Sequence, residues 1–216
     1  MELRRHIDRW LKEWKENRDH KPILVRGVRQ SGKTHSIKLF AESNYQVVIY
    51  LNFWDRPDLI DVFDGELDVD TIVRELSVKM PLPELKQGNT VFFYDEVQEC
   101  PRALLSLKTA LSDKRFDFIA SGSYLGVNGY VISDDTPKPV GCTDEFDMRT
   151  LDFEEFLWAK GYTDKEVSYI RDAFDARKPL SKSMHSSFTA LFREYLCIGG
   201  FPEAVCNYIE TNNILS

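Results

Sequence analysis

One stretch decides the fold of this chain, and it reads Gly27-Val28-Arg29-Gln30-Ser31-Gly32-Lys33-Thr34. It matches the pattern G-x-x-x-x-G-K-T, in which a glycine-rich backbone wraps around phosphate groups. The apolar run 22–26 before it resembles a buried strand, and residues 35–41 after it have the apolar spacing of a helix. Strand, loop and helix form the context that the motif needs. A glycine-containing turn that matches by chance is the alternative.

The residue types in this loop suit a polyphosphate. Glycine permits unusual dihedral angles and close approach, so that backbone N–H groups and the start of the helix face phosphate oxygens. Lys33 is expected to reach the β- and γ-phosphates, and the Thr34 hydroxyl to bind the Mg²⁺ that bridges them. The predicted nucleotide-binding residues are Gly27, Val28, Arg29, Gln30, Ser31, Gly32, Lys33, Thr34 and His35.

A second stretch, 90–96, reads Thr-Val-Phe-Phe-Tyr-Asp-Glu and runs from apolar residues directly into two carboxylates. A continuous apolar run is typical of a strand buried on both faces of a parallel sheet, and ligand sites lie at the carboxyl ends of such strands. We therefore expect Asp95 to hold Mg²⁺, directly or through water, and Glu96 to orient and deprotonate a water molecule. A strand followed by an acidic turn is the alternative, which the upstream loop disfavours.

A further strand is expected over 115–123, and it ends in small polar residues. Ser121 or Ser123 could hydrogen-bond the γ-phosphate or the attacking water, and a simple turn into the next segment is the alternative. The predicted catalytic residues are Glu96, Lys33 and Ser121, and the predicted metal ligands are Thr34 and Asp95.

The remaining pattern predicts the order of the sheet. A strand is expected over 46–53 and a last one within 142–151, with helices over 69–80, 103–111, 153–158, 164–177 and 188–196. Asp70 is the expected N-cap of the 69–80 helix, Asp152 or Thr150 that of the 153–158 helix, and Gly199-Gly200 ends the last one. In one large division of P-loop proteins, a strand lies between the P-loop strand and the acidic strand, and a second, catalytic acid follows the first. Glu96 supplies such an acid after Asp95. We therefore expect an α/β fold, a P-loop NTPase three-layer sandwich with a parallel sheet ordered 5-1-4-3-2 and a small helical segment after it.

Composition limits the classes of function. The chain has 216 residues, of which 43% are hydrophobic and 29% charged, and its net charge is −7. The acidic balance argues weakly against a large DNA- or RNA-binding face, and the basic N-terminal segment is better explained as a solvated amphipathic helix. No apolar run approaches a membrane span or a signal-peptide core, so no membrane association and a cytoplasmic location are expected. The four scattered cysteines and four isolated histidines lack the spacing of metal ligands.

With these motifs in place, the chain resembles a family of bacterial and archaeal AAA+-class ATP-binding proteins, in which an ATPase core precedes a C-terminal domain of unknown function. The resemblance rests on residues 25–34, 50–53, 93–104, 121–123, 151–157, 191–196 and 199–205, and most specifically on D-E-V-Q-E-C-P-R and G-G-F-P-E-A. It implies ATP and Mg²⁺ as ligands. It also implies an ATPase domain over 1–160, followed by a helical segment, 161–216, that begins a truncated C-terminal region.

Two readings of the function are left open. One is ATP hydrolysis that drives a conformational change on an unknown protein or DNA partner, with a homo-oligomer supplying an arginine in trans. The candidates for that arginine are Arg102, Arg115 and Arg149. The other is a nucleotide-gated binding switch with little turnover, for which a link to DNA is left open. A kinase on the same loop is the third option, disfavoured because a kinase does not need Glu96 beside Asp95.

Overall fold

The computed structural model describes residues 1–17, 19–123 and 141–213, which fall into two compact units. The sheet unit comprises Trp10–Arg29 and Lys33–Met148, and the helical unit comprises Met1–Arg9, Gln30–Gly32 and Arg149–Ser216. The domain boundary expected after residue 160 falls inside the helical unit, and the assignment of domains stays a prediction. The loop expected over 126–140 lies outside the described residues.

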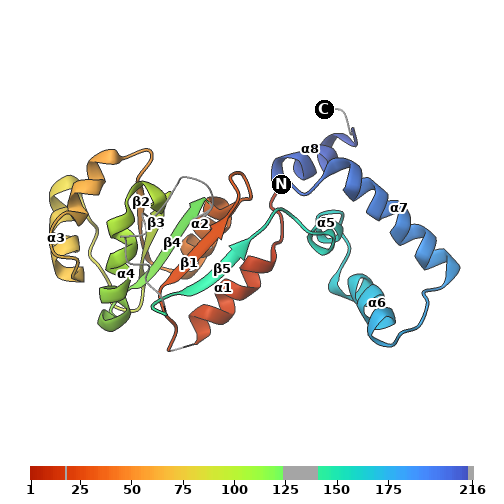
Figure 1. Cartoon of the computed structure of the whole chain (residues 1–216), viewed down its shortest axis with the longest axis horizontal. Coiled ribbons are helices and arrows are strands. Elements are labelled where there is room, and N and C mark those ends of the chain that lie inside the picture. Colours follow the sequence, from red (N-terminus) through yellow and green to blue (C-terminus); the bar gives the residue numbers. More distant parts are fainter. Residues whose placement is uncertain (18, 124–140, 214–216) are drawn as a thin grey trace. The chain divides into compact units, whose positions relative to one another are not determined.

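Figure 1 shows the order of the elements along the chain. The strands are β1 (Ile23–Gly27), β2 (Val47–Asn52), β3 (Thr90–Asp95), β4 (Asp117–Ser123) and β5 (Asp144–Met148). The α-helices are α1 (His6–Glu16), α2 (Lys33–Asn44), α3 (Val69–Lys79), α4 (Pro101–Asp113), α5 (Phe153–Ala159), α6 (Asp164–Asp175), α7 (Lys182–Ile198) and α8 (Pro202–Thr211). Two short 3₁₀ helices are η1 (Pro57–Phe63) and η2 (Val97–Glu99).

The five strands form one parallel sheet in the order β2-β3-β4-β1-β5. Read from the other edge, this is the predicted order 5-1-4-3-2, which is thereby confirmed. The strand that carries Asp95 is separated from the P-loop strand by β4. Because all strands are parallel, the loops that follow β1, β2, β3 and β4 meet at one edge of the sheet.

Helices cover both faces of the sheet, which makes the sheet unit a three-layer structure. On one face, Phe92 and Tyr94 of β3 belong to one hydrophobic cluster with Leu107 of α4 and Leu76 of α3. On the other face, α2 contacts β1, β2 and β4 and buries Ile37. All six residues of β3 are buried, as the continuous apolar run predicts for a central strand.

The start of α3 corrects one expectation. The N-cap is Asp68 rather than Asp70, because the Asp68 carboxylate accepts a hydrogen bond from the backbone N–H of Thr71 (2.9 Å). A capping side chain must lie before the helix to reach the third N–H inside it, and Asp70 already lies within the first turn. Asp70 instead pairs with Arg115.

The helical unit contains one helix that sequence analysis missed. Asp152, one of the two expected caps, begins α5 with a capping box that pairs it with Glu155. The chain does not end its helices at Gly199-Gly200, because α8 begins at Pro202, a residue suited to a first helical turn. Gly200 is required between α7 and α8, since a Cβ there would lie 2.2 Å from the Leu151 carbonyl oxygen. No helix within the described ranges is long and apolar enough to cross a membrane.

Candidate functional site

The P-loop joins the end of β1 to the start of α2. Two of its residues have left-handed backbone, Gln30 with φ 63° and Gly32 with φ 94°. Glycine adopts such angles without steric cost, whereas Gln30 is a non-glycine residue in a sparsely populated region, which is typical of ligand-binding loops. The second glycine of the motif is therefore needed for the geometry of the turn that leads into α2.

The Lys33 ammonium lies under this loop. Lys33 is only 6% exposed, and its Nζ donates hydrogen bonds to the carbonyl oxygens of Gly27 (3.0 Å) and Val28 (2.8 Å). Burial lowers the pKa of Lys33, the charges of Glu96 and Asp95 oppose that change, and the charge of Arg29 adds to it. Lys33 is thus a partly desolvated cation close to Asp95, the last residue of β3, and to Glu96, which follows it.

Asp95 is the centre of a hydrogen-bond network at the carboxyl edge of the sheet. Its Oδ2 accepts from the Thr34 hydroxyl (2.9 Å) and the Tyr50 hydroxyl (2.9 Å). Its Oδ1 accepts from the Ser121 hydroxyl and from the Glu96 N–H (3.1 Å). Asp95 is 2% exposed, so these donors replace water around a buried carboxylate. The structure thereby brings together Thr34, Asp95 and Ser121.

Glu96 lies beside this network in an unusual backbone conformation, with φ 52°. Its side chain is half-buried, and its Oε2 accepts a hydrogen bond from Gln98 Nε2 (2.5 Å). Non-glycine residues with positive φ cost energy and occur where the surroundings determine the backbone. The geometry therefore holds the second acid in one defined place relative to Asp95.

Tyr50 and Gln98 are the two residues of the site that sequence analysis missed. Tyr50 lies on β2, which pairs with β3, and its position beside Asp95 follows only from the register of those strands. Burial, and then the nearby charge of Asp95, raises the pKa of Tyr50, so the phenol keeps its proton and donates a hydrogen bond to the carboxylate. Gln98 lies within the specific D-E-V-Q-E-C-P-R run, which is the signal that could have identified it.

Thr34 and Asp95 fit a Mg²⁺ site by their chemistry and spacing. Mg²⁺ prefers hard oxygen ligands, and two ligands at right angles, each about 2.1 Å from the ion, lie about 3 Å apart. The two oxygens are 2.9 Å apart in this structure. No group of three or more His, Cys, Asp or Glu residues that could hold a metal is found among the described residues. A magnesium ion shared with phosphate groups needs no such cage.

The P-loop is also in contact with a buried arginine inside the helical unit. Arg5 is 5% exposed, and its Nη1 donates to the Ser31 carbonyl oxygen (2.8 Å) and its Nη2 to that of Arg149 (2.7 Å). Its Nε lies 3.0 Å from Oε1 of Glu155, which is 4% exposed. Arg5 thus fixes the backbone at Ser31 within the helical unit.

Other predicted residues lie outside the network around Asp95. His35 is exposed. Arg102 donates to the carbonyl oxygens of residues 63–65, and Arg115 pairs with Asp113 and Asp70. Arg149 is exposed and belongs to the helical unit. Two of the three candidate arginines are therefore bound to groups of their own chain.

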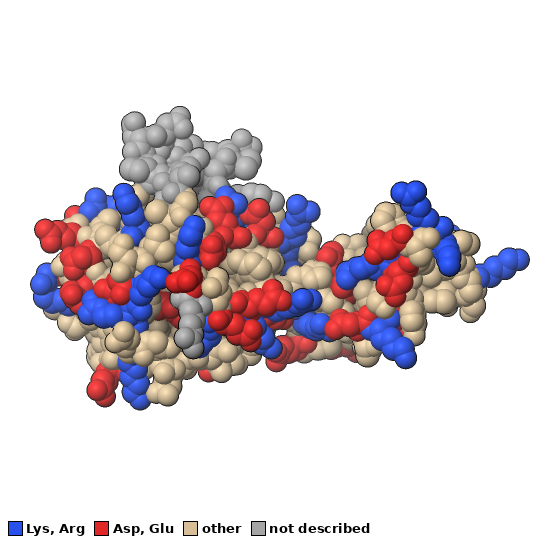
Figure 2. All heavy atoms as spheres, turned by 90° about the horizontal axis from the view of Figure 1, so that it is seen from below, with Lys and Arg blue, Asp and Glu red and all other residues tan. Residues whose placement is uncertain are grey.

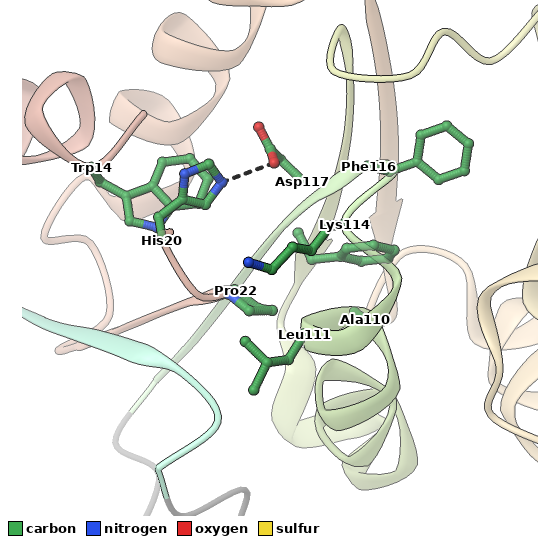
Figure 3. A pocket seen from close by; sticks show the side chains of 9 residues that line it. Trp14, His20, Pro22, Ala110, Leu111, Lys114, Phe116 and Asp117 are labelled. Carbon is green, nitrogen blue, oxygen red and sulfur yellow. Dashed lines mark hydrogen bonds and ion pairs between the residues drawn. The ribbon is translucent and has the colours of Figure 1, made fainter. Parts of the chain in front are cut away.

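A small pocket lies at the opposite, amino edge of the sheet (Figure 3). Its volume is about 70 Å³, far below the several hundred Å³ typical of ligand pockets. His20 lies there against Trp14, with ring centroids 4.1 Å apart. Its Nε2 contacts Asp117 Oδ1 (2.9 Å) and its Nδ1 contacts the Asn17 carbonyl oxygen (2.6 Å). Because both nitrogens face acceptors, the contacts favour the doubly protonated form of His20 and raise its pKa.

Comparison with known proteins places the chain in a family. A family model described as "AAA domain" matches residues 19–157. The chain is similar in structure to the Walker-type ATPase PABY2304 of Pyrococcus abyssi (TM-score 0.54, 14% identity, 99% of this chain and 69% of that one). It is also similar to AMPPCP-bound DnaA from Aquifex aeolicus (TM-score 0.51, 17% identity, 93% of this chain and 58% of that one). At these identities the two structures show the fold alone. No curated protein matches the sequence.

The matched span covers the P-loop, β2, β3 and β4, and therefore every residue of the network around Asp95. It also covers more than half of the chain. The order of the sheet agrees with the match, since an extra strand lies between the P-loop strand and the acidic strand. The chain belongs to the AAA domain family and is a P-loop protein of the AAA+ ATP-binding class.

Proposed function

We propose that the chain binds ATP together with Mg²⁺ and hydrolyses it to ADP and phosphate. The observation that carries this proposal is the 2.9 Å contact between the Thr34 hydroxyl and Asp95, beside a buried Lys33. Lys33 and the N–H groups of the P-loop bind the phosphates of the nucleotide, and Thr34 and Asp95 hold the ion. Tyr50 and Ser121 orient the Asp95 carboxylate, because each donates a hydrogen bond to one of its two oxygens.

Glu96 supplies the base in this proposal. It accepts a proton from a water molecule while the water oxygen forms a bond to the γ-phosphorus and the bond from that phosphorus to the bridging oxygen breaks. The bonding electrons leave with ADP. Mg²⁺, when bound, neutralises charge on the β- and γ-phosphate oxygens. Lys33, whose pKa burial lowers, is held near Glu96 and Asp95 and contributes positive charge at the same edge of the sheet.

The role of Glu96 is tested by replacing it with an isosteric amide that cannot accept the proton. In Glu96→Gln, we expect kcat for phosphate release at saturating ATP and Mg²⁺ to fall at least about 100-fold. Binding of ATP should persist, because Lys33, Thr34 and Asp95 are unchanged. Glu84→Gln makes the same chemical change at an exposed position and should release phosphate as the wild type does.

Equal rates for the wild type and Glu96→Gln would remove Glu96 from the mechanism. Transfer of phosphate to an added acceptor, in place of release to water, would favour a kinase instead.

The second candidate function, a nucleotide-gated switch, is favoured by the positions of the arginines. Arg102 and Arg115 are held by groups of their own chain. Phosphoryl transfer in this class of protein is accelerated by an arginine that neutralises charge, often from a neighbouring subunit. If the chain hydrolyses ATP, we propose that a second copy supplies this arginine and that the isolated chain turns over slowly. If no copy supplies it, the chain acts as a switch that binds ATP with little turnover. ATP binding with no hydrolysis at high protein concentration would favour the switch.

The partner of this cycle is proposed only by class. We propose a conformational change acting on a protein or DNA partner. On the face shown in Figure 2, acidic and basic side chains are interspersed over the described residues and no single sign dominates. A phosphate backbone is bound by clustered Lys and Arg, so this face gives DNA no particular support.

A further inference from the structure

Gln98 bridges Glu96 and the end of β4. It lies in η2, the short turn that follows β3, and its Nε2 donates to Glu96 Oε2 (2.5 Å). Its Oε1 accepts from the backbone N–H of Ser123 (3.3 Å). An ionised carboxylate only accepts and a backbone N–H only donates, so a single orientation of the amide satisfies both partners. Gln98 is therefore held at both ends of its side chain.

The backbone of Glu96 is fixed independently. Its N–H donates to Asp95 Oδ1 (3.1 Å), and its carbonyl oxygen accepts from the Glu99 N–H (3.0 Å). With the backbone held in the left-handed region, only the side-chain torsions remain to decide where the carboxylate lies. Among the described residues, Gln98 is the side chain that donates a hydrogen bond to that carboxylate.

Asn52, the polar residue opposite Asp95 on β2, has its amide occupied elsewhere. Its Nδ2 donates to Asp55 Oδ2 (2.8 Å) and to the Tyr50 hydroxyl (3.2 Å). Its Oδ1 accepts from the N–H groups of Trp54 (2.9 Å) and Asp55 (3.1 Å). Its contacts therefore stabilise the turn after β2 and leave the orientation of Glu96 to Gln98.

We propose that Gln98 is a positioning residue that orients the Glu96 carboxylate and ties it to the carboxyl end of β4 through the Ser123 N–H. This inference rests on the proposed hydrolysis of ATP. A small displacement of a reacting group lowers a rate strongly, whereas nucleotide binding depends on the P-loop and the ion. Gln98 thus contributes to kcat and not to affinity.

The test compares Gln98→Leu and Gln98→Glu with the wild type and with Gln87→Leu. Leucine removes both hydrogen bonds. Glutamate has the same shape and can still accept from Ser123, but it cannot donate to an ionised Glu96. Gln87→Leu makes the leucine change at an exposed loop position. The measurements are the dissociation constant of ATP with Mg²⁺, the kcat and KM for phosphate release, and the thermal midpoint.

We expect both Gln98 variants to lose about 10- to 100-fold in kcat. Gln98→Leu, which adds no charge near the phosphates, should keep the wild-type dissociation constant of ATP. Gln87→Leu should match the wild type in all measurements. If Gln98→Leu fails to fold, Gln98→Glu, which keeps the volume of the side chain, decides the question alone.

Two results would overturn the assignment of Gln98 while leaving the ATPase intact. One is a wild-type kcat in Gln98→Glu, and the other is a loss of ATP affinity in Gln98→Leu that matches its loss of kcat. A wild type that binds ATP but shows no turnover at any protein concentration would overturn the proposed hydrolysis, and the role of Gln98 with it.

Discussion

At the scale of single residues, one carboxylate organises the site. Asp95 receives hydrogen bonds from Thr34, Tyr50 and Ser121, which come from α2, β2 and β4. Thr34 and Asp95 could be predicted from the sequence because their motifs require those residue types at those positions. Tyr50 was not predicted, although it begins the matching stretch 50–53, because its contact with Asp95 depends on the register between β2 and β3.

His20 makes a residue-scale prediction about pH. The hydrogen bond with Asp117 raises the pKa of His20, burial opposes that shift, and the Asn17 carbonyl oxygen and the charges of Asp117 and Asp144 add to it. Because the pKa of His20 is raised in the folded state, protonated His20 contributes to the free energy of unfolding. This contribution is complete below the unfolded-state pKa of about 6.5 and is lost as the pH rises through the folded-state pKa.

We therefore expect the free energy of unfolding to fall between about pH 6 and pH 8, as measured by urea denaturation. His20→Gln should show a smaller fall over the same interval. His185→Gln, a change at an exposed histidine, is the control and should retain the wild-type slope. A slope that is identical in the wild type and His20→Gln would contradict the cationic role of His20.

At the scale of elements, the sequence predicted central strands better than helix ends. The run before Asp95 indicated a buried strand because apolar residues on both faces are unusual elsewhere, and all of β3 is buried. The N-cap of α3 was misplaced by two residues, since Asp68 and Asp70 are the same residue type and only the hydrogen bond to the Thr71 N–H distinguishes them. The pattern Ala204, Val205, Tyr208 was a usable signal for the missed α8.

The corrected cap leads to a prediction for α3. Asp68→Ala should lower the free energy of unfolding by about 1 kcal/mol, because the Thr71 N–H loses its acceptor. Asp70→Ala removes only an exposed ion pair with Arg115 and should cost at most about 0.5 kcal/mol. The two variants are compared by urea denaturation. A larger effect at Asp70 than at Asp68 would restore the original assignment.

At the scale of the whole molecule, the order of the sheet followed from two motifs. The P-loop required a strand before it. The second acid beside Asp95 indicated the class of P-loop proteins in which another strand lies between the P-loop strand and the acidic strand. The sheet confirms this order, because β4 lies between β1 and β3. The sequence suggested a division after residue 160, whereas the two units of the structure also group segments that lie far apart in the sequence, through buried contacts such as that of Arg5 with Glu155.

The proposed function depends on a triphosphate bound by Lys33, with an ion at Thr34 and Asp95. The most direct measurement is the calorimetric dissociation constant of ATP, with and without Mg²⁺, for the wild type and Lys33→Met. Lys108→Met, on an exposed position of α4, is the matched control. We predict tighter binding with Mg²⁺ and a loss of about 10- to 100-fold in Lys33→Met, since a charge-assisted contact is removed. Equal affinity in Lys33→Met and the wild type would contradict the central claim.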